Sequence, residues 1–445
     1  MTATLADLAA RLDAGQVTSE ELVTDCLEKI ANPQGEGART FTAIAPDRAL
    51  ADARAMDAAR KAGRALSPHA GIPVSVKCLF DVEGFVTTAG SKIFAGNAPA
   101  TSDAPAIARL KAAGFVVVGH TNMTEFAYSG LGMNPHYGTP GNPADRARIP
   151  GGSSSGAAVS VADGMAALGI GTDTGGSCRI PAAFCGLTGY KPTARRVPTE
   201  GAYPLSQTLD SIGSIAHGVA DCAIADAVMA GEALPSLGAP EAASLHVAVL
   251  ENFVLDGLTP GVAAAFEEAI RLLERAGVRV SRLRIDDLDR LPSLNAHGGI
   301  IAAEALAIHR DDLATREAGY DPRVSVRIRK GETMEPGEYE ALLETRRQII
   351  ARADELTKPF DAVIMPTVAM EAPRIADLDA DEALYGSQNI LALRNTTVGN
   401  FLDRCAISLP LPVDGLPVGL MLMGETMGDA RLFDVATAVE KLLTR

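Results

Sequence analysis

The sequence predicts an α/β protein that forms one large domain over residues 1–445, with a mixed central β-sheet covered by helices on both faces. Three observations lead to this fold class. Helix-like and strand-like segments alternate along most of the chain, which is typical of a sheet flanked by helices. Hydrophobic residues make up 47% of the sequence, which is enough for a large core. No internal repeat, low-complexity segment or linker divides the chain.

Helical patterns open the chain. Apolar residues spaced as on one helix face run from Leu5 to Leu12. Thr18 and Glu21 have the spacing of a capping box, which predicts the start of a second helix. We therefore expect N-terminal helices within residues 1–65.

A buried strand is predicted over residues 71–81 (GIPVSVKCLFD). Apolar residues alternate there with a second face that holds Ser75, Lys77 and Leu79. Asp103 is expected to cap the following helix, which ends before the strand-like FVVVG.

Strand-like and helix-like segments also alternate in the second half of the chain. The expected elements are a strand at 246–250, a helix at 260–276, a strand at 278–283, a charged helix at 337–357, a strand at 361–367, a strand within 415–424 and a last helix from 429. The more polar and irregular residues 285–335 are expected to be a helical insertion over one face.

Composition argues against several classes of protein. The net charge of −15, the absence of Trp and the 4% aromatic content make nucleic acid an unsuitable main partner. No apolar run has transmembrane length, and the first residues lack the basic and apolar segments of a signal peptide. The cysteines form no C-x-x-C pair and are expected to be reduced in a cytoplasmic protein. They are Cys26, Cys78, Cys178, Cys185, Cys222 and Cys405.

Lys77 is the first candidate for chemistry, because it lies inside an apolar strand between Val76 and Cys78. Lysine is rarely buried without a partner. Either its ammonium reaches water at the strand end, or burial keeps the amine neutral so that it can act as a base. The sequence leaves both interpretations open.

Two runs rich in Gly and Ser follow. The first, RIPGGSSSG (148–156), precedes a helix-like segment, where backbone N–H groups could bind an anion. It also fits G-x-S-x-G, but the strand that a nucleophile elbow requires is missing before it. The chain has no nucleotide-binding or zinc-binding pattern, so we expect neither a cofactor nor a metal.

The second run, GTDTGGSCRIP (171–181), follows a strand-like segment. Gly175 and Gly176 allow a sharp turn that directs successive N–H groups inward, with Ser177 directly after them. Such a turn suits acyl transfer, because a nucleophile lies beside donors that can hold an oxyanion. A plain Gly-rich turn with a capping serine is the alternative.

Taken together, these segments resemble the amidase signature family. GGSSSGAAVSVADGMAALGIGTDTGGSCRIPAAFCGLTGYKPT (151–193) looks like that family's defining segment, and the region 66–220 resembles its core. The lysine strand and the blocks TNMTEFAYSG, FDAVIMPT and LRNTTVGNFLDRCAISLPLPVDGLPVGLMLMG also look like family segments. The resemblance covers about 1–220 and 337–445 and is weak between them.

The resemblance implies a Ser–Ser–Lys triad. By position Ser177 is the nucleophile, Ser153 the bridging serine and Lys77 the base, and the peptide bond between Gly152 and Ser153 is expected to be cis. This triad needs no histidine. The backbone N–H groups expected to form the oxyanion hole belong to Thr174, Gly175, Gly176 and Ser177.

Other residues receive roles from the same resemblance. Asp173 and Arg179 are expected to hold the loop through charged hydrogen bonds, and Cys178 to be a buried residue rather than the nucleophile. The residues expected to contact substrate are Ala127, Tyr128, Ser129 and Ser154, although Tyr128 could equally belong to the core.

The implied function is hydrolysis of a carboxylic amide to the acid plus ammonia or an amine. The expected partner is a small-molecule amide, with no nucleic acid and no membrane, and a homodimer is left open. One alternative is the amidase subunit of a tRNA-dependent amidotransferase. The chain is somewhat short for that subunit, and it has Thr124 and Tyr128 where Asp and Met are usual. The other alternative, an inactive scaffold relative, is disfavoured because all three triad residues are present.

Overall fold

The computed structural model describes residues 3–444, and its centre is one sheet of eleven strands. Their spatial order is β1-β3-β2-β4-β6-β5-β10-β11-β9-β7-β8. The strands are β1 (Phe41–Ile44), β2 (Pro73–Lys77), β3 (Val116–Thr121), β4 (Leu168–Thr172), β5 (Thr188–Lys191), β6 (Ile212–Ala216), β7 (His246–Leu250), β8 (Arg279–Leu283), β9 (Ala362–Pro366), β10 (Ala406–Pro410) and β11 (Gly419–Met423).

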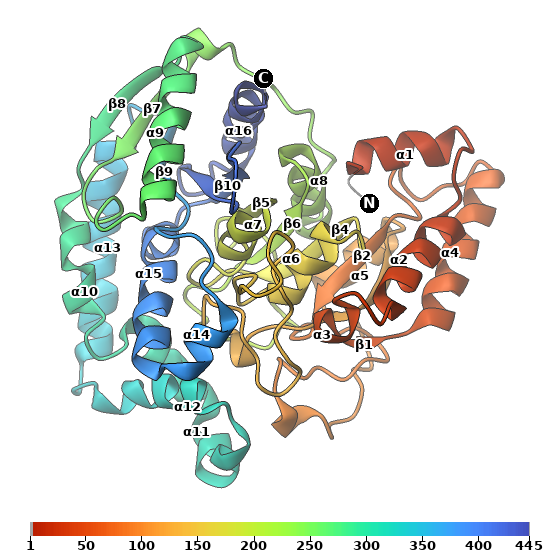
Figure 1. Cartoon of the computed structure of the whole chain (residues 1–445), viewed down its shortest axis with the longest axis horizontal. Coiled ribbons are helices and arrows are strands. Elements are labelled where there is room, and N and C mark those ends of the chain that lie inside the picture. Colours follow the sequence, from red (N-terminus) through yellow and green to blue (C-terminus); the bar gives the residue numbers. More distant parts are fainter. Residues whose placement is uncertain (1–2, 445) are drawn as a thin grey trace.

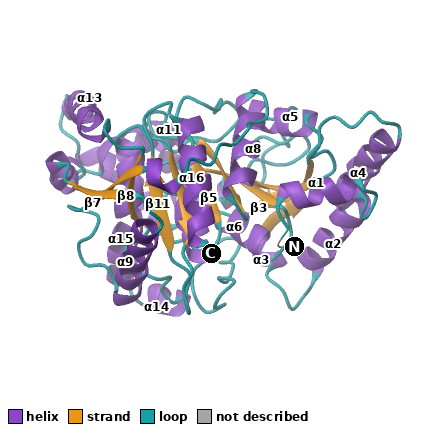
Figure 2. Cartoon of the chain, turned by 90° about the horizontal axis from the view of Figure 1, so that it is seen from above, coloured by secondary structure: helices purple, strands orange, loops and turns teal. Residues whose placement is uncertain are grey.

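Helices surround this sheet, and the strands lie as a twisted layer between them (Figures 1 and 2). The α-helices are α1 (Leu5–Asp13), α2 (Ser19–Ala31), α3 (Gly37–Thr40), α4 (Pro46–Lys61), α5 (Pro105–Ala112), α6 (Ser155–Ala162), α7 (Arg179–Cys185), α8 (Val219–Ala230), α9 (Pro260–Arg275), α10 (Leu291–Leu294), α11 (Gly299–Arg316), α12 (Pro322–Ile328), α13 (Glu338–Thr357), α14 (Ile375–Ala380), α15 (Glu382–Phe401) and α16 (Asp429–Leu443).

The sheet is mixed, as predicted. Strand β2 runs parallel to both β3 and β4, and β7 runs parallel to both β8 and β9. Antiparallel pairs join these two parallel groups through β6, β5, β10 and β11. The carboxyl ends of β2 and β4 therefore lie at the same edge of the sheet, where the polar residues of both strands are found.

Both faces of the sheet carry apolar side chains that pack against helices. On β9, Val363 belongs to a cluster with Ile349 of α13 and Val398 of α15. The next residue, Ile364, belongs to a different cluster that includes Phe433 of α16. This alternation follows the two-residue period of a strand and explains why the strand reads as continuously apolar.

The capping box of the second helix is present as predicted. Thr18 Oγ1 accepts a hydrogen bond from the Glu21 N–H at 3.1 Å, and the Glu21 carboxylate accepts one from the Thr18 N–H at 2.8 Å. Residues 41–44 add a strand, β1, that the sequence did not indicate.

Two local predictions were wrong. The strand expected over 71–81 covers only 73–77, and Leu79 packs in the apolar core rather than on the face of Lys77, because the chain turns after the strand ends. The N-cap of α5 is Ala104 instead of Asp103. The Asp103 carboxylate instead accepts the Glu83 N–H and pairs with Lys111 at 2.6 Å.

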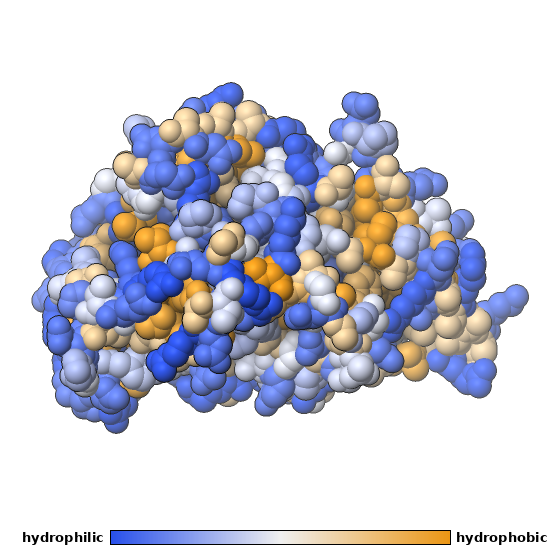
Figure 3. Space-filling view, turned by 90° about the horizontal axis from the view of Figure 1, so that it is seen from below, coloured by the Kyte–Doolittle hydropathy of each residue, from blue (hydrophilic) through white to orange (hydrophobic). Residues whose placement is uncertain are grey.

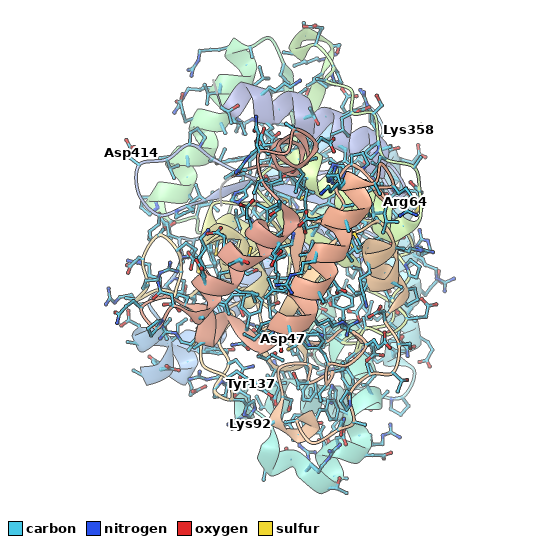
Figure 4. The ribbon with its side chains drawn as sticks, turned by 90° about the vertical axis from the view of Figure 1, so that its right-hand side faces the viewer. Asp47, Arg64, Lys92, Tyr137, Lys358 and Asp414 are labelled. Atoms are coloured by element: carbon cyan, nitrogen blue, oxygen red, sulfur yellow. The ribbon has the colours of Figure 1, made fainter. Side chains whose placement is uncertain are left out.

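Few large hydrophobic side chains are exposed among the described residues. One face mixes hydrophilic residues with small groups of hydrophobic ones (Figure 3). Charged side chains such as Lys358 and Asp414 lie at the outline of the molecule (Figure 4). Within residues 3–444 no helix combines the length and the apolar character that a membrane span requires. All six cysteines are buried, and none of them forms a disulfide in this described part of the chain.

Candidate functional site

The site is built where β2 and β4 end. These parallel neighbours pair Val76 with Ile170, which brings the final residues of both strands, Lys77 and Thr172, together. The Lys77 ammonium nitrogen donates a hydrogen bond to Thr172 Oγ1 at 2.9 Å and lies 2.7 Å from Ser153 Oγ. Two of the three residues of the predicted triad are therefore in direct contact.

The alternation of β2 determines where Lys77 points. Val74 and Val76 face the main apolar core, whereas Ser75 faces α6, to whose Ser160 it is hydrogen-bonded at 2.7 Å. Lys77 is fully buried, so its ammonium does not reach water at the strand end. Burial lowers the pKa of Lys77 to about 8. A substantial fraction of its amine is therefore neutral near this pH and able to accept a proton.

Ser153 lies in the first Gly/Ser run, just before α6. The peptide bond between Gly152 and Ser153 is cis, as predicted. The Ser153 carbonyl accepts the Thr124 N–H at 3.1 Å, and the Gly152 N–H is donated to the Gly130 carbonyl at 2.8 Å. A side chain at position 152 would meet the backbone of Gly132 at 2.6 Å, which explains the glycine there.

The second Gly/Ser run is held by α15. Gly176 has a φ of +136°, and a Cβ at this position would meet Thr396 Oγ1 at 2.1 Å, so only glycine fits. Thr396 Oγ1 donates to the Gly175 carbonyl at 2.6 Å. Among residues 3–444, none accepts a hydrogen bond from the backbone N–H groups of Thr174, Gly175, Gly176 and Ser177. Four successive N–H donors therefore have no protein acceptor in this part of the chain.

A buried ion pair anchors this loop. Arg179 and Asp173 are both fully buried, and Arg179 Nη2 lies 2.8 Å from Asp173 Oδ1. Burial raises the pKa of Asp173, but the Arg179 guanidinium outweighs this effect and holds the pKa at about 2. The Asp173 carboxylate also accepts the Cys178 N–H at 3.1 Å. The predicted charged hydrogen bonds of this pair are present.

Ser177 and Cys178 follow the glycines directly. The Ser177 carbonyl accepts the Ser154 N–H at 3.2 Å, which joins the two Gly/Ser runs. In the described part of the chain, the Ser177 hydroxyl has no hydrogen-bond partner, and a bond to Ser153 Oγ is not formed. The bridging role of Ser153 stays a prediction. Burial raises the pKa of the Cys178 thiol to about 12, so this thiol is protonated at neutral pH.

Among the residues predicted to contact substrate, Ser129 and Ser154 are engaged in hydrogen bonds within the protein. Ala127 has a φ of +59°, an uncommon value for a residue with a side chain. Ser129 Oγ donates to Asn389 Oδ1 of α15 at 2.8 Å and accepts from the Tyr385 hydroxyl at 2.9 Å. The Ser154 hydroxyl is directed to the Thr172 carbonyl at 3.4 Å.

Residues 286–333 include α11 and α12, which lie at the lower end of the view in Figure 1 and contact residues 126–128. The rings of His309 and Tyr320 lie 4.4 and 5.1 Å from the ring of Phe126. The Arg327 guanidinium of α12 lies 5.4 Å from the Tyr128 ring centre and donates to the Tyr128 carbonyl. This segment therefore packs against the stretch that holds Ala127 and Tyr128.

A small cavity of about 90 Å³ lies on the Thr172 side of Lys77. Its lining mixes polar and apolar groups and comes from β4 and from the loop before β6. The lining residues are Thr172, Thr199, Ala202, Tyr203, Pro204, Gln207 and Asp210. Sequence reasoning found none of them. Only the position of Thr172 at a strand end offered a signal, since polar side chains at parallel strand ends often line sites.

No group of three or more His, Cys, Asp or Glu side chains in residues 3–444 is arranged to hold a metal ion.

Comparisons with known proteins agree with this geometry. A family model described as Amidase matches residues 21–433. The chain is 36% identical to 2-amino-5-chloromuconic acid deaminase from Comamonas testosteroni, covering 99% of this chain and 96% of that protein. It is 33% identical to a glutamyl-tRNA(Gln) amidotransferase subunit from Symbiobacterium thermophilum, covering 98% and 96%. A crystal structure titled as an amidase matches with a TM-score of 0.89 at 28% identity, covering 99% of this chain and all of the other.

Proposed function

Because this chain belongs to the amidase family and is an amidohydrolase of C–N amide bonds, we propose that it acts through an acyl-enzyme formed on Ser177. Its substrate is a carboxylic amide, which it hydrolyses to the acid plus ammonia or an amine. The observation that carries the proposal is the 2.7 Å contact between the fully buried Lys77 Nζ and Ser153 Oγ. This contact links a base to the segment that lies beside Ser177.

In the proposed reaction Ser177 Oγ attacks the amide carbon while its proton passes through Ser153 Oγ to the neutral Lys77 amine. The protonated Lys77 then returns the proton through Ser153 to the nitrogen, and the C–N bond breaks. Water then attacks the acyl ester while its proton passes through Ser153 to Lys77. The proton returns through Ser153 to Ser177 Oγ as the acid is released. No cofactor enters these steps.

The free N–H groups of Thr174 to Ser177 support an oxyanion hole for this reaction. Donors that have no protein partner can bind the developing negative charge without first breaking another hydrogen bond. The Asp173–Arg179 pair and Thr396 hold the loop in this shape before substrate arrives.

Two observations favour ammonia as the leaving group. The cavity beside Thr172 has a volume of only about 90 Å³, which suits a small group. In addition, the relative from Comamonas testosteroni is named a deaminase.

Ammonia release from a panel of primary amides by the purified chain tests the proposed function. We expect hydrolysis of at least one small-molecule amide without any added protein. Release from glutamine only when the other amidotransferase components and tRNA are added would instead support the amidotransferase alternative. No turnover, combined with no labelling of Ser177 by a fluorophosphonate, would support an inactive scaffold.

Ser153→Ala is expected to reduce kcat/KM for an amide by about 10² to 10⁴, because it breaks the relay but keeps the nucleophile and the oxyanion hole. Steady-state kinetics measure this loss. Ser155→Ala is the matched control, since that hydroxyl makes only a long 3.5 Å contact with the Asn122 carbonyl. A Ser153→Ala rate close to wild type would assign the bridging role to another group.

The pH profile should reveal the titration of Lys77. Burial lowers its pKa to about 8, so the amine is protonated below this pH and cannot accept the Ser177 proton. We expect kcat/KM to fall about tenfold per pH unit below a midpoint near 8 and to level off above it. A profile that is flat between pH 6 and 9 would contradict a lysine base.

A further inference from the structure

The groups that surround Lys77 differ in the charge they can carry. Four titratable side chains act on it from the adjoining segments: Cys78, Cys178, Asp173 and Asp210. Burial raises the pKa of both thiols, that of Cys178 to about 12, so both are neutral where Lys77 titrates. Of these four groups, only the two carboxylates are charged at that pH.

Only one of these carboxylates has a counter-charge. Asp173 is paired with the Arg179 guanidinium at 2.8 Å, which offsets its negative field. Asp210 pairs with no Lys, Arg or His side chain within residues 3–444. Burial raises the pKa of Asp210 to about 6, so its carboxylate is ionised at the pH where Lys77 loses its proton.

The hydrogen bonds of Asp210 connect two parts of the site. Its Oδ1 accepts the Thr174 hydroxyl at 2.5 Å, and Thr174 belongs to the loop with the free N–H groups. Its Oδ2 accepts the N–H groups of Leu205 and Ser206 at 2.9 and 3.1 Å. Asp210 also lines the cavity beside Thr172, whose hydroxyl is bonded to Lys77.

We propose that Asp210 is a positioning residue with two effects on the reaction of Lys77 and Ser177. It fixes Thr174 in the oxyanion loop, and it supplies the unpaired negative charge that keeps the Lys77 amine basic. The second effect matters because the lysine must hold the serine proton long enough to deliver it to the leaving nitrogen. Burial alone would favour the neutral amine and leave it a weaker base. This inference rests on the proposed function.

The test compares three variants by kcat/KM against pH on one amide. Asp210→Asn removes the charge, and the midpoint of the acid limb is expected to move to lower pH by about 0.5 to 1 unit, with about a tenfold loss at the plateau. Thr174→Val removes the hydrogen bond but keeps the charge, so the rate should fall without a shift of the midpoint. Asp221→Asn is the control. Asp221 is also buried, accepts the Leu5 N–H at 2.9 Å, and lies on α8.

An unmoved midpoint in Asp210→Asn, or an equal shift in Thr174→Val, would overturn the proposal. If the asparagine variant does not fold, Asp210→Ser applies the same test, because a serine hydroxyl is neutral and can still accept a hydrogen bond. Phosphonylation of Ser177, measured over the same pH range, distinguishes a failure of the proposed function from a failure of the role of Asp210. If wild-type Ser177 is not labelled, or if its labelling shows no acid limb, the proposed function itself is refuted. If the wild-type pH profile is normal but the Asp210→Asn midpoint does not move, only the role of Asp210 is refuted.

Discussion

Ser177→Ala is expected to abolish amide turnover while the protein stays folded. In the proposed mechanism no other group can carry the acyl intermediate: the adjacent Cys178 thiol is buried and its pKa is raised to about 12. We expect kcat to fall by at least about 10⁴, with the residual rate due to the oxyanion loop and substrate binding. The Ser177 side chain makes no hydrogen bond in the described part of the chain, so its loss should barely change the free energy of unfolding.

A fluorophosphonate probe followed by peptide mapping tests the assignment directly. Wild-type protein and a Cys178→Ala variant should be labelled on Ser177, and Ser177→Ala should not be labelled. Labelling of Ser153 or Ser154 in the wild type would show that the nucleophile lies in the first Gly/Ser run.

Lys77→Ala is expected to damage amide hydrolysis much more than hydrolysis of an ester with the same acyl group. The protonated lysine delivers a proton to the leaving nitrogen, and an amine anion is a very poor leaving group. An alkoxide leaves far more easily, so an ester depends less on this proton. We expect a loss of about 10⁴ in kcat/KM for the amide and a loss at least about tenfold smaller for the ester.

Matched substrates and matched variants make this comparison decisive. Lys77→Met preserves most of the side-chain volume and should show the same amide-to-ester difference. Lys191 offers a control, because it is a second buried lysine whose pKa burial lowers to about 8, with its amine bonded to the Pro192 carbonyl. Lys191→Met should leave the ratio unchanged. Equal losses on amide and ester in Lys77→Ala would restrict the lysine to the role of a base.

The sequence predicted the parts of the site that depend on local patterns. The two-residue alternation in β2 correctly placed Lys77 on the face opposite Val76, and the glycines at 175 and 176 correctly indicated a sharp turn. The mixed sheet between helices followed from the alternation of elements. Where the pattern was extended beyond the strand, as at Leu79, it failed, because periodicity cannot indicate where pairing stops.

The residues that the sequence did not reveal come from distant segments. Asp210 contacts Thr174 across 36 positions, and Thr396 contacts Gly175 across 221. Neither lies in a pattern that indicates a partner, since one aspartate or threonine looks like any other until the chain is folded. The prediction that Asp103 caps α5 failed for a related reason, because Lys111 and the Glu83 N–H compete for its carboxylate.

The contacts of α15 with the Gly175–Gly176 turn also mean that the site is completed late in synthesis. Lys77, Ser153 and Ser177 are all made early, but Arg179 takes the Thr396 carbonyl as a partner 217 residues later. A ribosome-bound chain that has not yet reached residue 401 therefore carries the three reactive side chains without the helix that holds the turn before Ser177. Unfinished chains would thus hydrolyse no amide. Activity would begin only once α15 has been made and has packed against the turn before Ser177.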